Sequence, residues 1–157
     1  NHTYLYIKYD YDQDTREVMQ QEITKKVQEI TAAIITENMT DTEKEMAIND
    51  YLCSHLVYSQ GALEEARKNN YVSVSGYKNA FNAYGALVEG NCVCRGYADA
   101  FNLLAKEAGL PAILVTGMLD GEVPHAWNKV KIDNKWCIID TTNNDSDFAP
   151  RLFIIKF

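Results

Sequence analysis

The sequence predicts an α+β fold in which the helices come first and an antiparallel sheet comes last. Hydrophobic residues recur at helical spacing in several segments before Pro111, whereas the three segments after it have the length and composition of strands. Such an order is typical of an α+β domain rather than of a doubly wound parallel sheet. With 157 residues, 46% of them hydrophobic, the chain can bury one core, and we expect residues 1–157 to form a single domain.

The N-terminal segment is expected to form a strand followed by a long helix. Residues 3–11 alternate in hydrophobicity with a period of two, which is typical of an edge strand. After Asp14 the period becomes helical and continues to about Glu37. The chain opens at Asn1 with neither a Met nor a signal-peptide pattern, so we expect it to be a piece of a longer protein.

A second helix and a less regular segment follow. Thr40 and Glu43 fit a capping box that opens the helix. The inward face of this helix is expected to consist of Ile48, Tyr51, Leu52 and Leu56. A short polar helix over residues 62–68 precedes a stretch rich in Ser, Gly and Tyr that extends to Tyr77. This stretch either covers a groove or is only a long connection.

The last helix before the sheet has the clearest limits. Residues 81–88 form one or two helical turns that stop at Gly90. The stronger helix begins at Cys94 and ends at about Ala108, because Gly109 and Pro111 follow.

Three strands are expected at residues 112–119, 123–132 and 135–141. Asp133-Asn134 is typical of a two-residue hairpin turn between the second and third of these strands. Such a turn pairs the last residue of one strand with the first residue of the next, here Ile132 with Lys135.

The same register predicts a contact between a histidine and a carboxylate. It places Trp127 opposite Asp140 and His125 opposite Thr142, which makes His125 and Asp140 diagonal neighbours on one face. Diagonal neighbours are about 7–8 Å apart at the backbone, a gap that an imidazole and a carboxylate can close with one hydrogen bond.

The charge of the chain argues against two classes of partner. Its 15 Lys and Arg residues are outnumbered by 22 Asp and Glu residues, which gives a net charge of −7. That charge repels phosphate backbones and anionic lipid surfaces. No hydrophobic run approaches the roughly 20 residues that a membrane helix requires. We therefore expect neither nucleic-acid binding nor membrane insertion.

One of the four cysteines is placed for chemistry. Residues 53, 92, 94 and 137 are too irregularly spaced for a disulfide framework. Cys94 lies in the first turn of a helix, where the helix dipole and free N–H groups favour a thiolate and can bind an oxyanion. Helical phase turns its side chain inward, whereas Cys92 gains little from the dipole and Arg95 is expected to be solvated.

A histidine in a strand is more often structural than catalytic, and an aspartate at a strand end more often bonds the following turn. The predicted register changes this interpretation. An inward cysteine together with His125 and Asp140 on a shared face indicates a Cys94-His125-Asp140 triad, in which the aspartate orients the imidazole. No cofactor and no metal ion is expected for such chemistry.

Three motifs resemble the transglutaminase-like superfamily, which includes transglutaminases, peptide N-glycanases and bacterial proteins described as protease-like. They are residues 94–98 with Phe101, residues 125–128, and Trp136 followed by residues 140–142. The resemblance implies a papain-like fold in which the cysteine helix packs against an antiparallel sheet. It also implies that Cys94 is the nucleophile, that His125 is general base and then acid, and that Asp140 orients it.

The resemblance further implies acyl transfer or hydrolysis at peptide or isopeptide carbonyls through a thioester. The enzyme would be a protease, amidase, deamidase or transglutaminase acting on a peptide or protein, including a cell-wall peptide, at the surface or outside of a bacterium. The chain departs from the family pattern at Asn143, where an aromatic residue is frequent, and at Cys137. The second oxyanion donor is left open between Tyr58 and Tyr84.

Two alternatives belong to other classes. A metal-binding or redox module could take soft ligands from Cys92, Cys94, His125 and Cys137, although zinc would occupy the thiol that the helix activates. A transglutaminase-like domain of a cell-surface protein could also keep the fold and act only as a binding domain.

Overall fold

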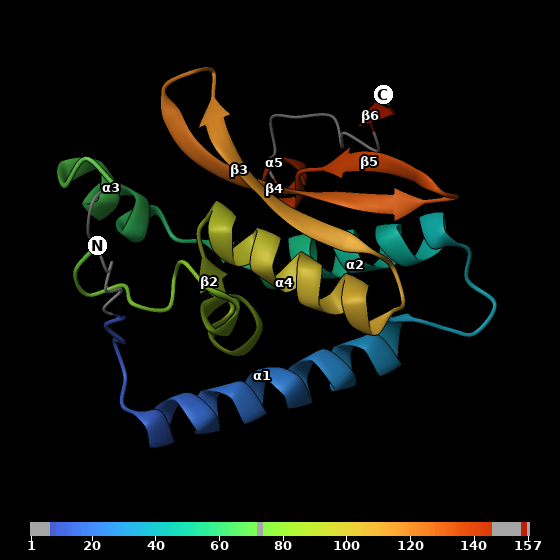
Figure 1. Cartoon of the computed structure of the whole chain (residues 1–157), viewed down its shortest axis with the longest axis horizontal. Helices are drawn as coiled ribbons and strands as arrows, with labels where there is room; N and C mark the ends of the chain where they lie inside the picture. The colour runs from blue at the N-terminus through green and yellow to red at the C-terminus, as the bar shows by residue number, and fades with distance from the viewer. Residues whose placement is uncertain (1–6, 72–73, 146–154, 157) are drawn as a thin grey trace, which may run out of the picture.

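The computed structural model describes residues 7–71, 74–145 and 155–156, and in these residues the main helices precede the four-stranded sheet (Figure 1). The helices are α1 (Gln13–Ile34), α2 (Asp41–His55), α3 (Gln60–Lys68), η1 (Gly85–Glu89), α4 (Cys94–Glu107) and α5 (Thr141–Asn144). The strands are β1 (Val57–Tyr58), β2 (Asn91–Cys92), β3 (Ala112–Leu119), β4 (Val123–Ile132), β5 (Lys135–Ile139) and β6 (Ile155–Lys156).

Side-chain caps define where the first two helices begin. The carboxylate of Asp12 accepts a hydrogen bond from the backbone N–H of Thr15 at 2.8 Å, which starts α1. The predicted capping box is confirmed at α2, where Thr40 and Glu43 each bond the backbone N–H of the other. The two helices turn Val27, Ile30, Ile48 and Leu52 into the core.

The strand predicted for residues 3–11 is wrong in the part that the structure describes. Residues 3–6 lie outside the described part of the chain, and residues 7–11 form no strand. Ile7 and Tyr9 are exposed, and the guanidinium of Arg16 lies 3.7 Å from the ring centre of Tyr9. In the described part of the chain no neighbouring strand pairs with residues 7–11, so alternating hydrophobicity alone does not produce a strand here.

Helix α4 is the centre of the molecule. It contacts β3 and β4 on one side and α1 and α2 on others, so that it lies beneath the sheet in Figure 1. The predicted inward face is confirmed as buried: Tyr97, Ala98, Phe101, Leu104, Ala105 and Ala108. The helix ends as predicted before Gly109, whose φ of 78° is left-handed.

The sheet is antiparallel, with strand order β3-β4-β5-β6. Asp133 and Asn134 form the predicted two-residue turn, with φ of 48° and 64°, and Ile132 pairs with Lys135. The observed pairs follow the predicted register, but the pairing stops three pairs before the predicted pair of His125 with Thr142.

The final pair of β4 and β5 joins Asn128 to Ile139, so Asp140 does not pair with Trp127 and Thr142 does not pair with His125. Asp140 leaves the sheet because it caps α5, and the predicted strand end at residue 141 is therefore wrong.

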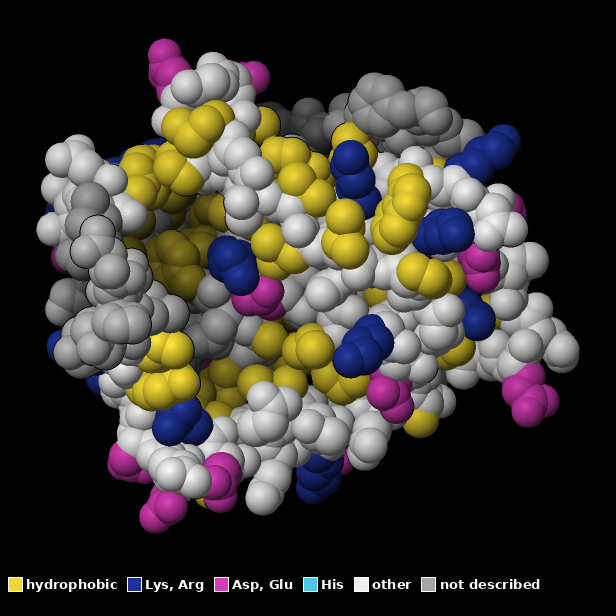
Figure 2. All heavy atoms as spheres, viewed as in Figure 1, with side chains coloured by type: hydrophobic (Ala, Val, Ile, Leu, Met, Phe, Trp, Pro, Cys, Tyr) yellow, Lys and Arg dark blue, Asp and Glu magenta, His cyan; other side chains and the backbone are white. Residues whose placement is uncertain are grey.

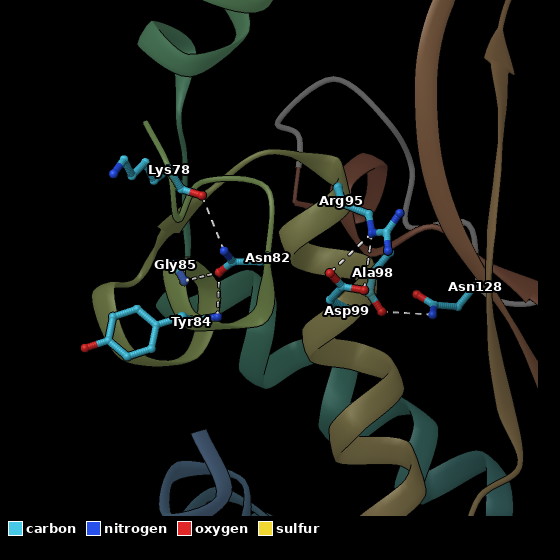
Figure 3. Close-up of polar contacts among 8 residues, drawn as sticks. All are labelled: Lys78, Asn82, Tyr84, Gly85, Arg95, Ala98, Asp99 and Asn128. Atoms are coloured by element: carbon cyan, nitrogen blue, oxygen red, sulfur yellow. Dashed lines mark hydrogen bonds and ion pairs between the residues drawn. The ribbon is translucent and has the colours of Figure 1, made fainter. Parts of the chain in front are cut away.

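A short parallel pair lies beside the start of α4. Strands β1 and β2 join Val57 to Asn91 and Tyr58 to Cys92. Just before β2, the helical turns predicted over residues 81–88 are found as the π-helix η1 at Gly85–Glu89, which stops at Gly90 as expected. Asn82 begins this element, because its side-chain oxygen accepts the N–H groups of Tyr84 at 2.9 Å and Gly85 at 3.2 Å (Figure 3).

Candidate active site

Cys94 lies at the first position of α4 and lines a large cavity. Its side chain is partly buried, and the N-cap residue Val93 makes no side-chain cap hydrogen bond. The thiol therefore has the position at the positive end of a helix dipole that the sequence predicts, and the structure adds access to a cleft.

Cys92 lies two residues earlier but in a different environment. It is fully buried in the core, and a Cβ on Gly96 of α4 would lie 2.9 Å from its Sγ. Burial, and then the neighbouring Cys94, raises the pKa of Cys92 to about 12. A thiol with a pKa this high stays protonated at neutral pH and is a poor nucleophile. Cys94, which is only partly buried, is therefore the better candidate of the two cysteines.

His125 and Asp140 are brought together as the register predicts. The Nε2 atom of His125 lies 2.7 Å from Oδ2 of Asp140. An ionised carboxylate only accepts hydrogen bonds, so Nε2 carries a proton and the imidazole keeps Nδ1 for its hydrogen bond with Cys94. The bonds to Asp140 and then Cys94 outweigh burial and raise the pKa of His125 to about 10.

Asp140 is held by a neighbour that sequence reasoning noted only as a departure from a family pattern. Its Oδ1 accepts the backbone N–H of Asn143 at 3.2 Å, and its Oδ2 accepts the side-chain N–H of the same residue at 2.7 Å. The three-residue spacing between Asp140 and Asn143 could have indicated this contact, because an N-cap aspartate bonds the backbone N–H of the residue three positions later. Asn143 therefore holds the carboxylate that faces His125.

Of the two tyrosines considered as oxyanion donors, the structure places one at the site. Tyr58 lines the cleft, and burial, followed by Cys94, raises its pKa to about 12, although a hydrogen bond with the Cys94 backbone acts in the opposite direction. The hydroxyl of Tyr84 instead donates to Glu22 at 2.7 Å, and its side chain points away from α4 (Figure 3). The pairing of β1 with β2 explains the position of Tyr58.

A buried asparagine ties the sheet to the cysteine helix. The side-chain nitrogen of Asn128, three residues after His125 on β4, donates to the backbone oxygen of Ala98 on α4 at 3.0 Å (Figure 3). This bond links the strand that carries the imidazole to the helix that carries the thiol, so it helps to set the distance between them.

The cleft in front of Cys94 and His125 has a volume of about 1130 Å³. Helix α3, residues 74–78 and the β3-β4 hairpin supply its walls, and Figure 2 shows it as a hollow with hydrophobic sides. Of the two interpretations of the Ser, Gly and Tyr stretch, the structure thus favours a groove wall. Arg95 is exposed as predicted, and its Nε pairs with Asp99 at 3.2 Å at the edge of the cleft (Figure 3).

Two further results concern metals and membranes. In residues 7–71, 74–145 and 155–156, no three His, Cys, Asp or Glu side chains converge to hold a metal ion. Cys92 and Cys137, two ligands of the zinc alternative, are both buried. No helix of the described chain is both long and apolar enough to cross a membrane.

Two solved structures have a similar fold. A structure described as a TGase superposes with a TM-score of 0.68 at 22% identity, covering 92% of this chain and 36% of the other. A candidate cysteine protease from Cytophaga hutchinsonii superposes with a TM-score of 0.55 at 20% identity, covering 94% of this chain and 47% of the other. These matches confirm the predicted fold, in which α4 packs on an antiparallel sheet.

Sequence comparison gives the family. Kyphoscoliosis peptidase of Homo sapiens is 27% identical over 125 residues, and that of Mus musculus is 26% identical over 125 residues. Each alignment covers 73% of this chain but 17% of the relative, so the chain spans about a sixth of these proteins. Residues 28–141, from α1 to the start of α5, match the family described as the transglutaminase-like superfamily. The chain belongs to the transglutaminase-like superfamily.

Proposed function

We propose that this domain catalyses thiol-dependent acyl transfer or hydrolysis at amide carbonyls, with Cys94 as nucleophile, His125 as acid and base, and Asp140 as the residue that orients His125. One observation carries this proposal. The Nε2 atom of His125 is engaged by Asp140 at 2.7 Å while the same ring bonds Cys94 at the start of α4. This is the arrangement of a nucleophile, a base and an orienting group that covalent catalysis requires.

The first half-reaction forms a thioester. His125 keeps its proton at neutral pH, because its pKa is raised to about 10 by Asp140 and Cys94, and an imidazolium stabilises the thiolate beside it. The sulfur attacks the carbonyl carbon, and the electrons of the C=O bond move to the oxygen. When the tetrahedral intermediate collapses, the C–N bond breaks and Nδ1 of His125 delivers its proton to the leaving amine.

The oxyanion of this intermediate needs donors that are already in place. The hydroxyl of Tyr58 supplies one in the proposed mechanism, since its hydrogen bond with the Cys94 backbone holds it beside the thiol. In the second half-reaction, water or an amine attacks the thioester. His125, now neutral, takes the proton of the attacking group, and the C–S bond breaks to regenerate the thiolate and the imidazolium.

The substrate class follows from the cleft and from the relatives. A cavity of about 1130 Å³ that is open to solvent suits a peptide or protein side chain. The relatives are named as a peptidase and a TGase, which supports hydrolysis and transfer respectively, and both reactions share the thioester. We propose a peptide or protein acyl donor.

The test compares the cysteines and then the products. At pH 6, iodoacetamide should alkylate Cys94 at least tenfold faster than Cys53, and His125→Ala should remove the difference. Wild type and Cys94→Ala are then incubated with Gln-containing peptides, with and without an amine acceptor. Amine incorporation identifies a transferase and hydrolysis alone identifies a protease or deamidase. The Cys53→Ala variant is the matched control and should behave as wild type.

Equal alkylation rates for all exposed thiols, with no product from any peptide, would contradict the proposed catalysis. This result would favour the alternative in which the domain keeps the fold but only binds a partner.

A further inference from the structure

We propose that the cleft selects acyl donors that carry a carboxylate next to the reacting carbonyl, and that Arg67 on α3 binds this carboxylate. The inference deepens the proposed function and rests on it, because it assumes that the acyl group is transferred to Cys94. The ligand is an acidic peptide segment, recognised through one guanidinium.

Arg67 lies on the wall of the cleft that also holds Cys94 and His125. It comes from the last turn of α3, and its side chain is exposed to the cleft solvent. Its charge also acts on the hydroxyl of Tyr58, which interacts in turn with Cys94. Arg67 therefore lines the same cleft as Cys94 and His125, where its charge can act on a charged group of a bound substrate.

The residues that line the cleft carry a net positive charge, whereas the whole chain carries a net negative charge. The chain has 22 acidic and 15 basic residues, whereas the charged residues that line the cleft are the cations Arg67, Lys78, Arg95 and protonated His125 and the anions Asp10 and Asp145. An acidic protein that gathers an excess of cations at its one large described cavity provides a local attraction for anions.

The other charged groups of the cleft already have partners. Arg95 pairs with Asp99 at 3.2 Å, and Asp145 accepts a hydrogen bond from the hydroxyl of Tyr97 at 2.5 Å. The amine of Lys78 donates to the backbone oxygen of Asp10 at 3.4 Å (its side chain is labelled in Figure 3) and lies 5.0 Å from the centre of the Tyr11 ring.

Arg67 differs from these groups. No described residue forms an ion pair or a side-chain hydrogen bond with it, so its five N–H donors are available to a ligand. A guanidinium binds a carboxylate through two parallel hydrogen bonds, which gives geometry as well as charge. Leu63, Tyr71 and Phe81 line the same cavity and offer apolar surface for the hydrocarbon part of such a donor.

Two alkylating agents that differ in charge test the proposal without a known substrate. Iodoacetate and iodoacetamide both transfer a two-carbon group to the thiolate with loss of iodide, but only iodoacetate carries a carboxylate. We expect Arg67→Gln to lower the rate of Cys94 alkylation by iodoacetate about threefold to tenfold and to leave the rate with iodoacetamide unchanged. Added salt at about 0.5 M should reduce this difference, because it screens an exposed charge.

Lys68→Gln is the matched control, because Lys68 is the adjacent exposed cation of α3 and does not line the cleft. It should change neither rate, and Arg67→Lys should restore part of the preference for iodoacetate. The unchanged iodoacetamide rate also shows that each variant is folded.

A second measurement uses peptides. A succinylated tripeptide amide should protect Cys94 of the wild type from iodoacetamide at a lower concentration than its acetylated counterpart, and Arg67→Gln should abolish the difference. Equal effects of Arg67→Gln on both reagents, or equal protection by both peptides, would overturn the role of Arg67 while Cys94 remained reactive. If Cys94 reacts no faster than Cys53 in the wild type, it is the proposed function that fails.

Discussion

Asp140 shows how one side chain can serve the fold and the candidate site together. Its Oδ1 accepts the backbone N–H of Asn143 and so begins α5, while its Oδ2 lies between the side-chain nitrogen of Asn143 and Nε2 of His125. With both oxygens held, the carboxylate cannot turn away from the imidazole without breaking the helix cap. The orientation of His125 therefore depends on Asn143 through the carboxylate of Asp140.

Replacement of Asn143 should weaken catalysis without unfolding the chain. Asn143→Ala removes the 2.7 Å bond to Oδ2 of Asp140, and we expect the rate of Cys94 alkylation at pH 6 to fall about threefold to thirtyfold. Asn143→Asp has the same shape but opposes two carboxylates, so its loss should be larger and should shrink as the pH falls and one of them binds a proton. A pH series of alkylation rates measures both effects, and Thr142→Ala is the neighbouring control.

If the alanine and aspartate variants lost the same activity at every pH, the proposed support of Asp140 by Asn143 would be wrong.

Helix α4 meets strand β2 so closely that one position tolerates only glycine. A Cβ on Gly96 would lie 2.5 Å from Cβ of Cys92 and 2.9 Å from its Sγ. Helix propensity alone would make alanine the better residue at an interior helix position, by about 0.5–1 kcal/mol. Packing and propensity thus predict opposite signs for the same substitution.

We expect packing to prevail, so that Gly96→Ala lowers the free energy of unfolding by about 1–3 kcal/mol. Urea unfolding followed by circular dichroism measures the change. Glu107→Ala, at an exposed position of the same helix, serves as the control and should stay within about 0.5 kcal/mol of wild type. A more stable Gly96→Ala protein would show that α4 moves away from β2 at little cost.

Elements with local signals could be predicted from the sequence. The capping box at Thr40, the left-handed Gly109 and the Asp133-Asn134 turn each depend on a few adjacent residues, and all three are confirmed. From them follow the start of α2, the end of α4 and the register of β4 with β5. The choice of the three proposed catalytic residues depended on this register together with the family resemblance.

Elements that depend on distant partners could not be predicted. The alternation over residues 7–11 says nothing of whether a neighbouring strand exists. In the π-helix η1 the backbone of Gly85 packs closely against the backbone of Asn79, since a Cβ on Gly85 would lie 2.1 Å from the oxygen of Asn79. The choice between Tyr58 and Tyr84 required the parallel pairing of β1 with β2, for which the sequence has no local signal.

At the scale of the whole molecule, stability should depend on pH through a buried acid. Glu45 of α2 is fully buried, and neither of its carboxylate oxygens has a hydrogen-bond partner in the described chain. Burial, and then Asp50, raises the pKa of Glu45 from 4.5 to about 7. Its protonated form is favoured in the folded state, so the stability present below about pH 4.5 is lost as the pH rises through 7.

Glu45→Gln should therefore stabilise the protein at pH 8, where the wild type must bury a charge, and should have little effect at pH 4. A shift from 4.5 to about 7 corresponds to a few kcal/mol, on the order of 3 kcal/mol at most. Thermal or urea unfolding of both proteins from pH 4 to pH 8 measures the difference, with the exposed Glu37→Gln as control. Parallel stability curves for Glu45→Gln and wild type would contradict the buried charge.

Titration of His125 should also lower the free energy of unfolding as the pH rises, but at higher pH than titration of Glu45. Its pKa is raised from 6.5 to about 10 by Asp140 and Cys94, so the stability it adds below pH 6.5 is lost as the pH rises towards 10. The Glu45 window, from about pH 4.5 to 7, overlaps only slightly with the His125 window, from about pH 6.5 to 10, so unfolding measured below pH 6 and above pH 8 distinguishes Glu45 from the candidate site.

The parallel pairing of β1 with β2 has a consequence for how this domain can change over time. Residues 59–90 leave the site next to Tyr58 and return to it next to Cys92, so the two ends of this segment are fixed side by side. Insertions at the exposed residues that follow α3 should change the wall that carries Arg67 while Cys94 keeps its place, since closing a longer loop between fixed ends costs little additional entropy. We expect the exposed residues of this wall to be replaceable in a way that buried residues of the same segment, such as Ala80 and Leu87, are not.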